Sequence, residues 1–486
     1  HDVDLRAAAG TVIEVDPVEG WVTVSRSVRL DPLRSRGFAS DPPLRDDVIR
    51  AAIARTAEHV LSGADVMGGR LLDGVVPPVD LLVARPGETP ADVVVRVGRA
   101  LDGEVLAVQG PPGAGKTFAA AKLVQALLDD GKTVGVTALS HAVIDNLLRE
   151  IGRPAVHKTG SGEDDAEDGD ESDGALIQRV SSNQEVVAGL RSGEARLVGG
   201  TAWLWARDDL AEAVDVLVVD EAGQFSLANA VAVAQAARSV VLLGDPQQLA
   251  QPTKAAHPFG AQVSALEHLI GPHDTILADR GVFLETTYRM HPDITSFVSE
   301  LSYDSRLGSE PGLSAQQVLG SGSLAGSGLR WYAVPHDGRS AASPEEALAV
   351  RDLVDDLLAR EWVDAKGVRS PLREADILVV APFNAHVAEL RAVLPSNVRV
   401  GTVDKFQGRQ GAVVVYSMAS SSAELAPRGV GFLYDVNRLN VAISRAKALC
   451  VLVGSPALLD AHVATPEQLR AVNAVCRYVE VAVPLA

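Results

Sequence analysis

The chain has 486 residues, 47% of them hydrophobic, so it can bury the cores of roughly two to four domains. Two cysteines, Cys450 and Cys476, exclude a disulfide framework, a four-cysteine zinc site and a four-cysteine iron–sulfur cluster, and they predict a reducing, cytoplasmic setting. The formal charge of −19 argues against a surface coated with positive charge for nucleic acid, although a local basic groove stays compatible with it. No apolar run has membrane-spanning length, so we expect no membrane partner.

The first ninety residues differ in character from the rest of the chain. The stretch "TVIEVDPVEGWVTVSR", residues 11–26, alternates apolar and polar residues on both sides of a turn and predicts two strands. A helix is predicted from Asp46 to Leu61. We therefore assign residues 1–90 to a small accessory segment that contains β-structure.

A phosphate-binding loop follows in "LAVQGPPGAGKTFAAAKLVQALL". Val105 to Val108 predicts a buried strand, and the apolar residues from Ala120 to Leu128 recur at helical spacing. Between strand and helix, backbone N–H groups of a glycine-rich loop can converge on phosphate oxygens. Lys116 is expected on the β- and γ-phosphates of ATP and Thr117 on Mg²⁺. The predicted nucleotide-binding residues are Gly110, Pro111, Pro112, Gly113, Ala114, Gly115, Lys116 and Thr117.

Two further sets of short apolar runs predict two parallel sheets, each covered by helices on both faces. The first set comprises residues 134–139, 196–201, 214–220 and 240–244, and the second comprises residues 282–285, 377–381, 398–403, 412–417 and 449–454. Only the first set is joined to a phosphate loop. The predicted domains are therefore residues 91–280, which bind phosphate, and residues 281–486, which contribute something else. Residues 308–328 form a Gly/Ser-rich connection within the second domain.

Between the motifs lies an acidic run, "EDDAEDGDESD", in which eight of eleven residues from Glu163 to Asp173 are acidic. We expect a solvated loop, with a mimic of nucleic acid as the alternative.

Carboxylates and amides end the next strands. Asp220 and Glu221 follow an apolar run, where ligands bind in parallel sheets. Asp220 suits a hold on Mg²⁺, and Glu221 suits orienting and deprotonating the attacking water. Gln248 could sense the γ-phosphate. Farther along, Tyr288, Arg289, Arg438 and Arg445 offer a ring and cationic donors for the charge that develops during hydrolysis.

In order, GPPGAGKT, ALSHAVIDNLL, GGTAW, DEAGQ, GDPQQL, TYRMHP, GTVDKFQG and NRLNVAISRAK resemble the helicase motifs of superfamily 1, in the group of the nonsense-mediated decay helicase. The resemblance spans residues 104–456. It implies an α/β fold with two RecA-like P-loop NTPase domains in tandem, ATP in the cleft, and 5′ to 3′ movement on a single strand. The stretches "VGVTALSHAVIDNLL" and "LVGGTAWLWARDDL" are similar to the helicase half of bacterial RecB-like nuclease–helicase fusions.

The resemblance also assigns roles to residues. Tyr288 would stack on adenine, and Arg289 and Arg445 would be the arginine fingers. The positions that match contacts to the nucleic-acid backbone are Ser140, Thr201, Pro382 and Thr402. Two departures stand out. Gln109 is the only glutamine before Gly110, so the adenine-reading glutamine of many relatives is missing. Gln410 stands where the family pattern has Glu, which predicts a weaker ribose or coupling contact.

The sequence thus predicts an ATP- and Mg²⁺-dependent helicase or translocase on single-stranded nucleic acid, with DNA as the expected substrate. A nucleic-acid-stimulated switch or clamp that does not unwind and an RNA helicase remain open. The joint presence of Glu221, Arg289 and Arg445 opposes an ATP-binding module without hydrolysis. The chain starts at His1, and its motifs resemble those of the fusions, so we expect a RecB-like nuclease module upstream in the same polypeptide, with a stand-alone helicase as the alternative. The first ninety residues contain no lysine, which such a nuclease site needs.

Overall fold

The chain divides into two compact units, His1–Val48 and Ile49–Ala486. The computed structural model describes residues 11–16 and 21–25 as backbone, and residues 46–160, 176–250, 260–406 and 408–485 in full. In the first unit, β1 (Thr11–Asp16) and β2 (Trp21–Ser25) pair antiparallel, which confirms the predicted hairpin. The acidic run at residues 163–173 lies outside the described residues.

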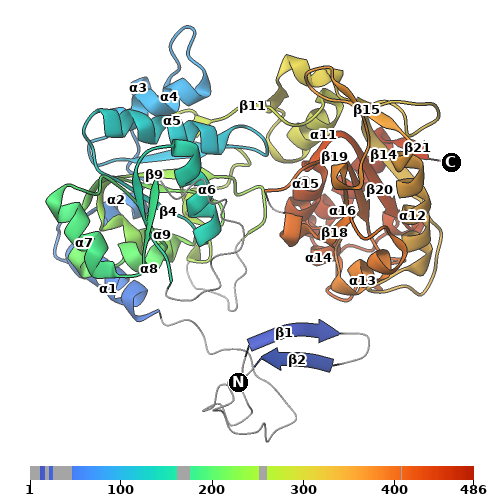
Figure 1. Cartoon of the computed structure of the whole chain (residues 1–486), viewed down its shortest axis with the longest axis horizontal. Coiled ribbons are helices and arrows are strands. Elements are labelled where there is room, and N and C mark those ends of the chain that lie inside the picture. Colours follow the sequence, from blue (N-terminus) through green and yellow to red (C-terminus); the bar gives the residue numbers. More distant parts are fainter. Residues whose placement is uncertain are drawn as a thin grey trace, which may run out of the picture. The chain divides into compact units, whose positions relative to one another are not determined.

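Lobe 1, defined here as the elements from α1 to β10, is built on an eight-stranded sheet in the order β10-β3-β9-β8-β4-β7-β5-β6 (Figure 1). All neighbouring strands are parallel. Its central strands are mostly apolar and are buried along nearly their whole length, as in parallel sheets that helices cover on both faces. The strands are β3 (Val105–Gln109), β4 (Val134–Thr137), β5 (Ala155–Lys158), β6 (Ile177–Val180), β7 (Leu197–Gly199), β8 (Val214–Val219), β9 (Ala237–Gly244) and β10 (Gly281–Phe283).

Four helices of lobe 1, α4, α6, α9 and α10, begin at a side-chain cap. Thr89 and Asp92 form a capping box at the start of α4, with a proline at its first position. The predicted helix at residues 46–61 is confirmed as α1. The helices are α1 (Asp47–Leu61), α2 (Met67–Leu72), α3 (Val79–Leu82), α4 (Pro90–Arg99), α5 (Lys116–Asp129), α6 (His141–Ile151), α7 (Asn183–Ser192), α8 (Ala202–Trp205), α9 (Leu227–Ala234) and α10 (Ala265–Ile270).

Lobe 2, the elements from β11 to β21, has its own parallel sheet in the order β18-β17-β19-β20-β14-β21. The strands of this sheet are β14 (Gly328–Ala333), β17 (Ile377–Ala381), β18 (Arg399–Thr402), β19 (Gly411–Ser417), β20 (Ala446–Gly454) and β21 (Val483–Leu485). Its helices are α11 (Pro292–Ser302), α12 (Pro344–Leu358), α13 (Asn384–Val393), α14 (Val430–Leu433), α15 (Val436–Ile443) and α16 (Pro466–Val481). Short strands β11 (Thr286–Thr287) and β12 (Gly308–Ser309) pair with each other, while β13 (Gln317–Val318), β15 (Glu361–Val363) and β16 (Arg369–Pro371) form a small antiparallel sheet.

Two tandem α/β lobes with parallel sheets confirm the predicted fold class. One strand prediction is wrong: the run at residues 282–285 was placed in the second sheet, but β10 pairs with β3 at the edge of the first. A short apolar run carries no information about which sheet it joins. The exact domain limits at residues 90 and 280 stay a prediction. Among the helices that the structure describes, none has the length and apolar character needed to cross a membrane.

Candidate functional site

Three adjacent strands of lobe 1 deliver the predicted ATP-binding residues to one edge of the sheet. The phosphate loop follows β3, Gln248 follows β9 by four residues, and Asp220 and Glu221 follow β8 directly. Because β3, β9 and β8 are neighbours and parallel, their carboxyl ends lie side by side. This is the edge where open α/β sheets bind ligands.

The phosphate loop depends on two glycines with left-handed backbone. Gly113 has φ +74° and Gly115, the N-cap of α5, has φ +78°. A Cβ on Gly113 would lie 2.6 Å from both Arg289 Cβ and Thr287 Oγ1. Glycine therefore lets the first residues of lobe 2 approach the loop, and Tyr288 N–H donates to Gly113 O at 2.9 Å.

Lys116 is the first residue of α5, so its side chain lies beside the helix N-terminus, where anions are favoured. Its Nζ donates to Gly110 O at 2.6 Å, within the loop itself. Two further protons of the ammonium can serve phosphate oxygens.

Asp220 is a buried carboxylate that forms no ion pair with any described residue. Burial, followed by the charge of Glu221, raises the pKa of Asp220 to about 7, and Lys116 opposes this only weakly. The Glu221 N–H donates to Asp220 Oδ1 at 2.9 Å. A divalent cation supplies the charge that such a carboxylate needs, so Asp220 and Thr117 fit the predicted Mg²⁺.

Glu221 itself has φ +53°, the left-handed region that non-glycine residues rarely adopt. Such strain persists only where the surroundings hold it, and it gathers at functional sites. Here the turn after Glu221 packs tightly against the end of β9: a Cβ added to Gly244 would lie only 2.3 Å from Gly223 N.

Lobe 2 contributes a buried arginine whose side chain is incompletely hydrogen-bonded within the described part of the chain. Arg445 is 3% exposed, and its Nε and Nη2 have no hydrogen-bond partner among the described residues. Burial lowers the pKa of Arg445 to about 10, while the nearby charge of Glu221 acts in the opposite direction. A buried, unsatisfied guanidinium close to Glu221 is suited to an anionic ligand.

The other arginines differ from Arg445. Arg289 is half-buried; its Nε donates to Gln410 Oε1 at 2.9 Å and its Nη1 to Ser444 O at 3.1 Å. Burial and the like charge of Arg445 lower the pKa of Arg289, which indicates that both arginines share one region. Arg438, in contrast, forms an ion pair with Asp404 of the same lobe, with Nη1 3.0 Å from Oδ2.

Two observations bear on recognition of the base. The ring of Tyr288 is 63% exposed and is therefore accessible for stacking. Gln109 cannot read a base edge, because its Oε1 accepts from Ile276 N at 2.7 Å and its Nε2 donates to Asp274 O at 3.0 Å.

The candidate contacts to nucleic acid lie in pairs on neighbouring strands. Ser140 follows β4 and caps α6, Thr201 follows β7 and precedes α8, and β4 and β7 are adjacent. In lobe 2, Pro382 follows β17 and Thr402 ends β18, and these strands are also adjacent. Ser140 is exposed, Thr201 and Thr402 are half-buried, and Pro382 is buried.

A feature that sequence reasoning missed lies between the end of α13 and the edge strand β18. A hollow of about 690 Å³, here called the basic hollow, is lined by Arg391, Arg399, Lys405 and Arg409, and no described residue of its lining is acidic. Its cations are spread over nineteen sequence positions and several elements, so no charged run marks them. Only the fold brings them together, in a chain with net charge −19.

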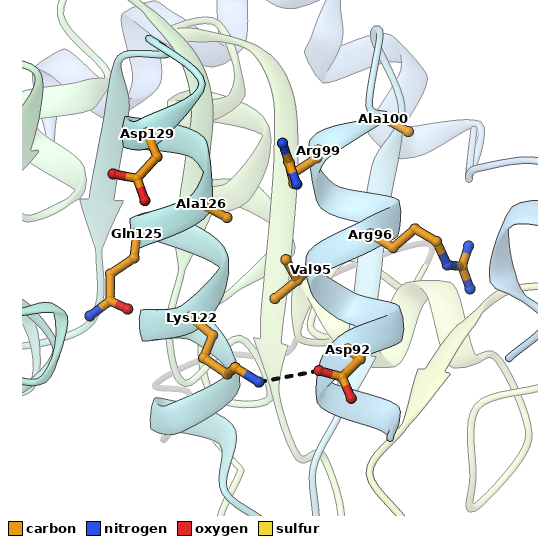
Figure 2. A pocket seen from close by; sticks show the side chains of 9 residues that line it. All are labelled: Asp92, Val95, Arg96, Arg99, Ala100, Lys122, Gln125, Ala126 and Asp129. Atoms are coloured by element: carbon orange, nitrogen blue, oxygen red, sulfur yellow. Dashed lines mark hydrogen bonds and ion pairs between the residues drawn. The ribbon is translucent and has the colours of Figure 1, made fainter. Parts of the chain in front are cut away.

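A second groove, of about 560 Å³ between α4 and α5, is different in kind (Figure 2). Lys122 pairs with Asp92 at 3.2 Å across it, and Arg99 pairs with Asp130 at 2.6 Å. Its charges satisfy one another, so we assign it no ligand.

Family models and related proteins match most of this chain. Two family models, each described as an AAA domain, match residues 96–269 and 261–457. The DNA replication ATP-dependent helicase/nuclease JHS1 of Arabidopsis thaliana is 26% identical over 73% of this chain and 27% of its own length. The regulator of nonsense transcripts 1 homolog of Drosophila melanogaster is 27% identical over 75% of this chain and 34% of its own length.

The ATP-dependent helicase NAM7 of Saccharomyces cerevisiae is 26% identical over 72% of this chain and 40% of its own length. The chain thus spans well under half of each of these three relatives. Among solved structures, the arterivirus nonstructural protein 10 helicase with DNA has a TM-score of 0.40 and 15% identity, covering 75% of this chain and 63% of that chain. The closer resemblance to RecB-like fusions stays a prediction. The sequence matches, together with the ordered motifs, support the assignment of this chain to the superfamily 1 helicases.

Proposed function

We propose that this chain is an ATP-driven helicase or translocase that moves 5′ to 3′ on single-stranded DNA. The observation that carries the proposal is the meeting of two half-sites. Lobe 1 presents the phosphate loop, Asp220 and Glu221 on adjacent strand ends, and lobe 2 supplies the buried, incompletely hydrogen-bonded Arg445 close to Glu221.

The proposed roles follow from this geometry. Lys116 and the loop amides hold the triphosphate, and Glu221 orients the attacking water and accepts its proton. Arg289 and Arg445 stabilise the charge that spreads over the transferred phosphoryl group. Magnesium, when bound through Thr117 and Asp220, would neutralise phosphate charge.

The proposed strand path runs over the carboxyl ends of β4 and β7 in lobe 1 and of β17 and β18 in lobe 2. Ser140 and Thr201, and Pro382 and Thr402, would contact the sugar–phosphate backbone, which positions a strand without reading its sequence. The basic hollow borders β18, the strand that Thr402 ends, and its four cations favour phosphate.

One experiment separates this proposal from its rivals. We expect ATP hydrolysis to be stimulated by single-stranded DNA more than by RNA, and a forked duplex with a 5′ tail to be separated faster than one with a 3′ tail. Hydrolysis without strand separation or movement would favour a clamp or switch. Stronger stimulation and strand separation with RNA would favour an RNA helicase. Binding of ATP without hydrolysis would favour an ATP-binding module.

We also propose, on motif resemblance, that a RecB-like nuclease module belongs to the same polypeptide and that the protein acts in the cytoplasm, where its two free cysteines stay reduced. The purified chain should then show no metal-dependent cleavage of DNA. Robust cleavage by pure protein would mean that the nuclease site is misplaced.

A further inference from the structure

Three buried polar side chains form a chain of hydrogen bonds between the lobes. Tyr303 follows the last residue of α11 in lobe 2, and Asp245 follows the last residue of β9 in lobe 1. The Tyr303 hydroxyl donates to Asp245 Oδ2 at 2.6 Å. Asn440 Nδ2, in α15, donates to the same hydroxyl at 2.9 Å. Tyr303 and Asn440 are 0% exposed and Asp245 is 1% exposed.

At the lobe 1 end, this chain of contacts reaches a candidate ATP-sensing residue. Asp245 Oδ2 also accepts from Gln248 Nε2 at 2.9 Å. One oxygen thus joins Tyr303 to Gln248 and fixes the orientation of the amide. The second N–H of Gln248 Nε2 is left for a phosphate oxygen.

At the lobe 2 end, the contacts reach the helix that precedes the arginine finger. Asn440 Nδ2 donates to Gln247 O at 2.7 Å as well as to Tyr303. Helix α15 ends at Ile443, two residues before Arg445. The same helix therefore carries both the contact to Tyr303 and the chain that positions Arg445.

The Tyr303 hydroxyl acts as the donor in this network. Burial, reinforced by the Asp245 carboxylate, raises the pKa of Tyr303 well above its ordinary value, so the phenol keeps its proton. A hydrogen bond to a buried carboxylate is stronger than one between neutral groups. Loss of the Tyr303 hydroxyl would leave Asp245 Oδ2 with one hydrogen-bond donor fewer. The two hydrogen-bond partners of the Tyr303 hydroxyl, Asp245 and Asn440, belong to different lobes. The network is therefore complete only when α11 and α15 are docked against the end of β9.

We propose that Tyr303 is a positioning residue for ATP hydrolysis, whose hydroxyl holds Asp245 and thereby Gln248 in register with α15 and Arg445. The γ-phosphate is then sensed by Gln248 only when lobe 2 is in place to supply its arginine. The inference rests on the proposed role of Gln248 at the γ-phosphate.

The test begins with Tyr303→Phe, which removes one oxygen atom. We expect kcat for DNA-stimulated hydrolysis to fall about tenfold, with KM for ATP within twofold of the starting protein. The matched control is Tyr434→Phe, since the Tyr434 hydroxyl is equally buried and donates to Leu458 O at 2.7 Å inside lobe 2. This control should lower the unfolding temperature to a similar extent and leave kcat unchanged.

A double-mutant cycle with Gln248→Ala separates positioning from general destabilisation. Adding Tyr303→Phe to Gln248→Ala should lower kcat by less than twofold further, because both changes remove the same contact with phosphate. The proposal is overturned if Tyr303→Phe costs less than threefold in kcat, if its effect multiplies with that of Gln248→Ala, or if it raises KM as much as it lowers kcat. If Gln248→Ala alone keeps kcat within twofold, the role of Gln248 is wrong, whatever Tyr303→Phe does.

Discussion

Two side chains bear on the proposed binding of the base. Gln109 is fully engaged by the backbone at residues 274 and 276, and Tyr288 presents only an exposed ring. Stacking tolerates every base, because each has a π-face. We therefore expect GTP to be hydrolysed nearly as well as ATP, as measured by kcat/KM for each nucleotide.

Tyr288→Ala is the control for this prediction and should raise KM for both nucleotides alike. A preference for ATP above roughly a hundredfold, about 2.7 kcal/mol, would contradict it and would imply an adenine reader elsewhere.

Two arginines of one motif differ in their surroundings. Arg445 is buried without a partner for Nε or Nη2, whereas Arg438 pairs with Asp404 and stacks on Phe432 at 4.5 Å. Arginine fingers contribute on the order of 10³-fold or more to kcat. We expect Arg445→Ala to lower kcat by about that factor with little change in ATP affinity, and Arg438→Ala to lower basal kcat by less than tenfold. Equal losses of basal kcat in the two variants would show that burial does not identify the finger.

At the scale of elements, a buried network ties helices α12 and α13 to the end of β19. His386 Nδ1 accepts from Ser343 N at 3.3 Å, and its Nε2 lies 2.7 Å from Ser417 Oγ, which in turn donates to Glu346 Oε2. Ser343 begins α12, and His386 and Glu346 are 0% exposed. Burial lowers the pKa of His386 to about 4, so the ring is neutral in the folded protein.

This network predicts a pH dependence of stability. The unfolded chain binds a proton on His386 below about pH 6.5, while the folded chain does so only near pH 4. The contribution of neutral His386 to the free energy of unfolding is therefore complete above about pH 6.5. It is lost as pH falls towards 4, and the loss is on the order of 3 kcal/mol. Denaturant unfolding at several pH values should show a steeper acid loss for the starting protein than for His386→Gln. Identical pH profiles would contradict the prediction.

Much of the fold follows from the sequence because parallel strands covered on both faces are continuous apolar runs, as in β17. The phosphate loop, Asp220 and Glu221 could be placed for the same reason, since motifs at strand ends inherit the order of the sheet. The strand β10 was misplaced, because its residues look alike in either sheet. The strand β14 was overlooked, because it begins at the last glycine of a Gly/Ser-rich connection. Tyr303 could not be foreseen, since its partners Asp245 and Asn440 lie far away in sequence. The basic hollow could not be foreseen either, since its cations are not consecutive in the sequence and come from different elements.

At the scale of the whole molecule, the net charge of −19 opposes binding of a polyanion such as nucleic acid. Binding must therefore depend on local clusters of cations. Each phosphate contact on a single strand contributes about −0.7 to the slope of log K against log salt. We expect the double variant Arg391→Gln with Arg399→Gln, both in the basic hollow, to reduce that slope by about 1.4.

The charge-matched control is Arg351→Gln with Arg369→Gln, since these exposed arginines of lobe 2 pair with Asp352 and Glu361. The control should leave the slope unchanged. Equal slopes in the two double variants would show that net charge, rather than the hollow, governs binding.

The last prediction concerns coupling between nucleotide and strand. Glu221 lies on lobe 1 within electrostatic reach of Arg445 on lobe 2, and the Asp245–Tyr303–Asn440 contacts join the same two lobes. A bound triphosphate should therefore stabilise the docked arrangement, and hydrolysis should release it, as in other two-state closures. Glu221→Gln removes the base but keeps the size of the side chain, so it should bind ATP, hardly turn over, and hold a single strand more tightly with ATP than without.

Lys116→Ala supplies the contrast, because loss of the ammonium should weaken triphosphate binding itself and leave strand affinity indifferent to ATP. Fluorescence anisotropy of a labelled oligonucleotide, measured with and without ATP beside the turnover rate, tests both variants. If Glu221→Gln retains turnover within about tenfold of the starting protein, roughly 1.4 kcal/mol of barrier, Glu221 is not the base. If it loses turnover but ATP leaves its strand affinity unchanged, the chemistry is assigned correctly, and the coupling of the lobes to the strand is the part that fails.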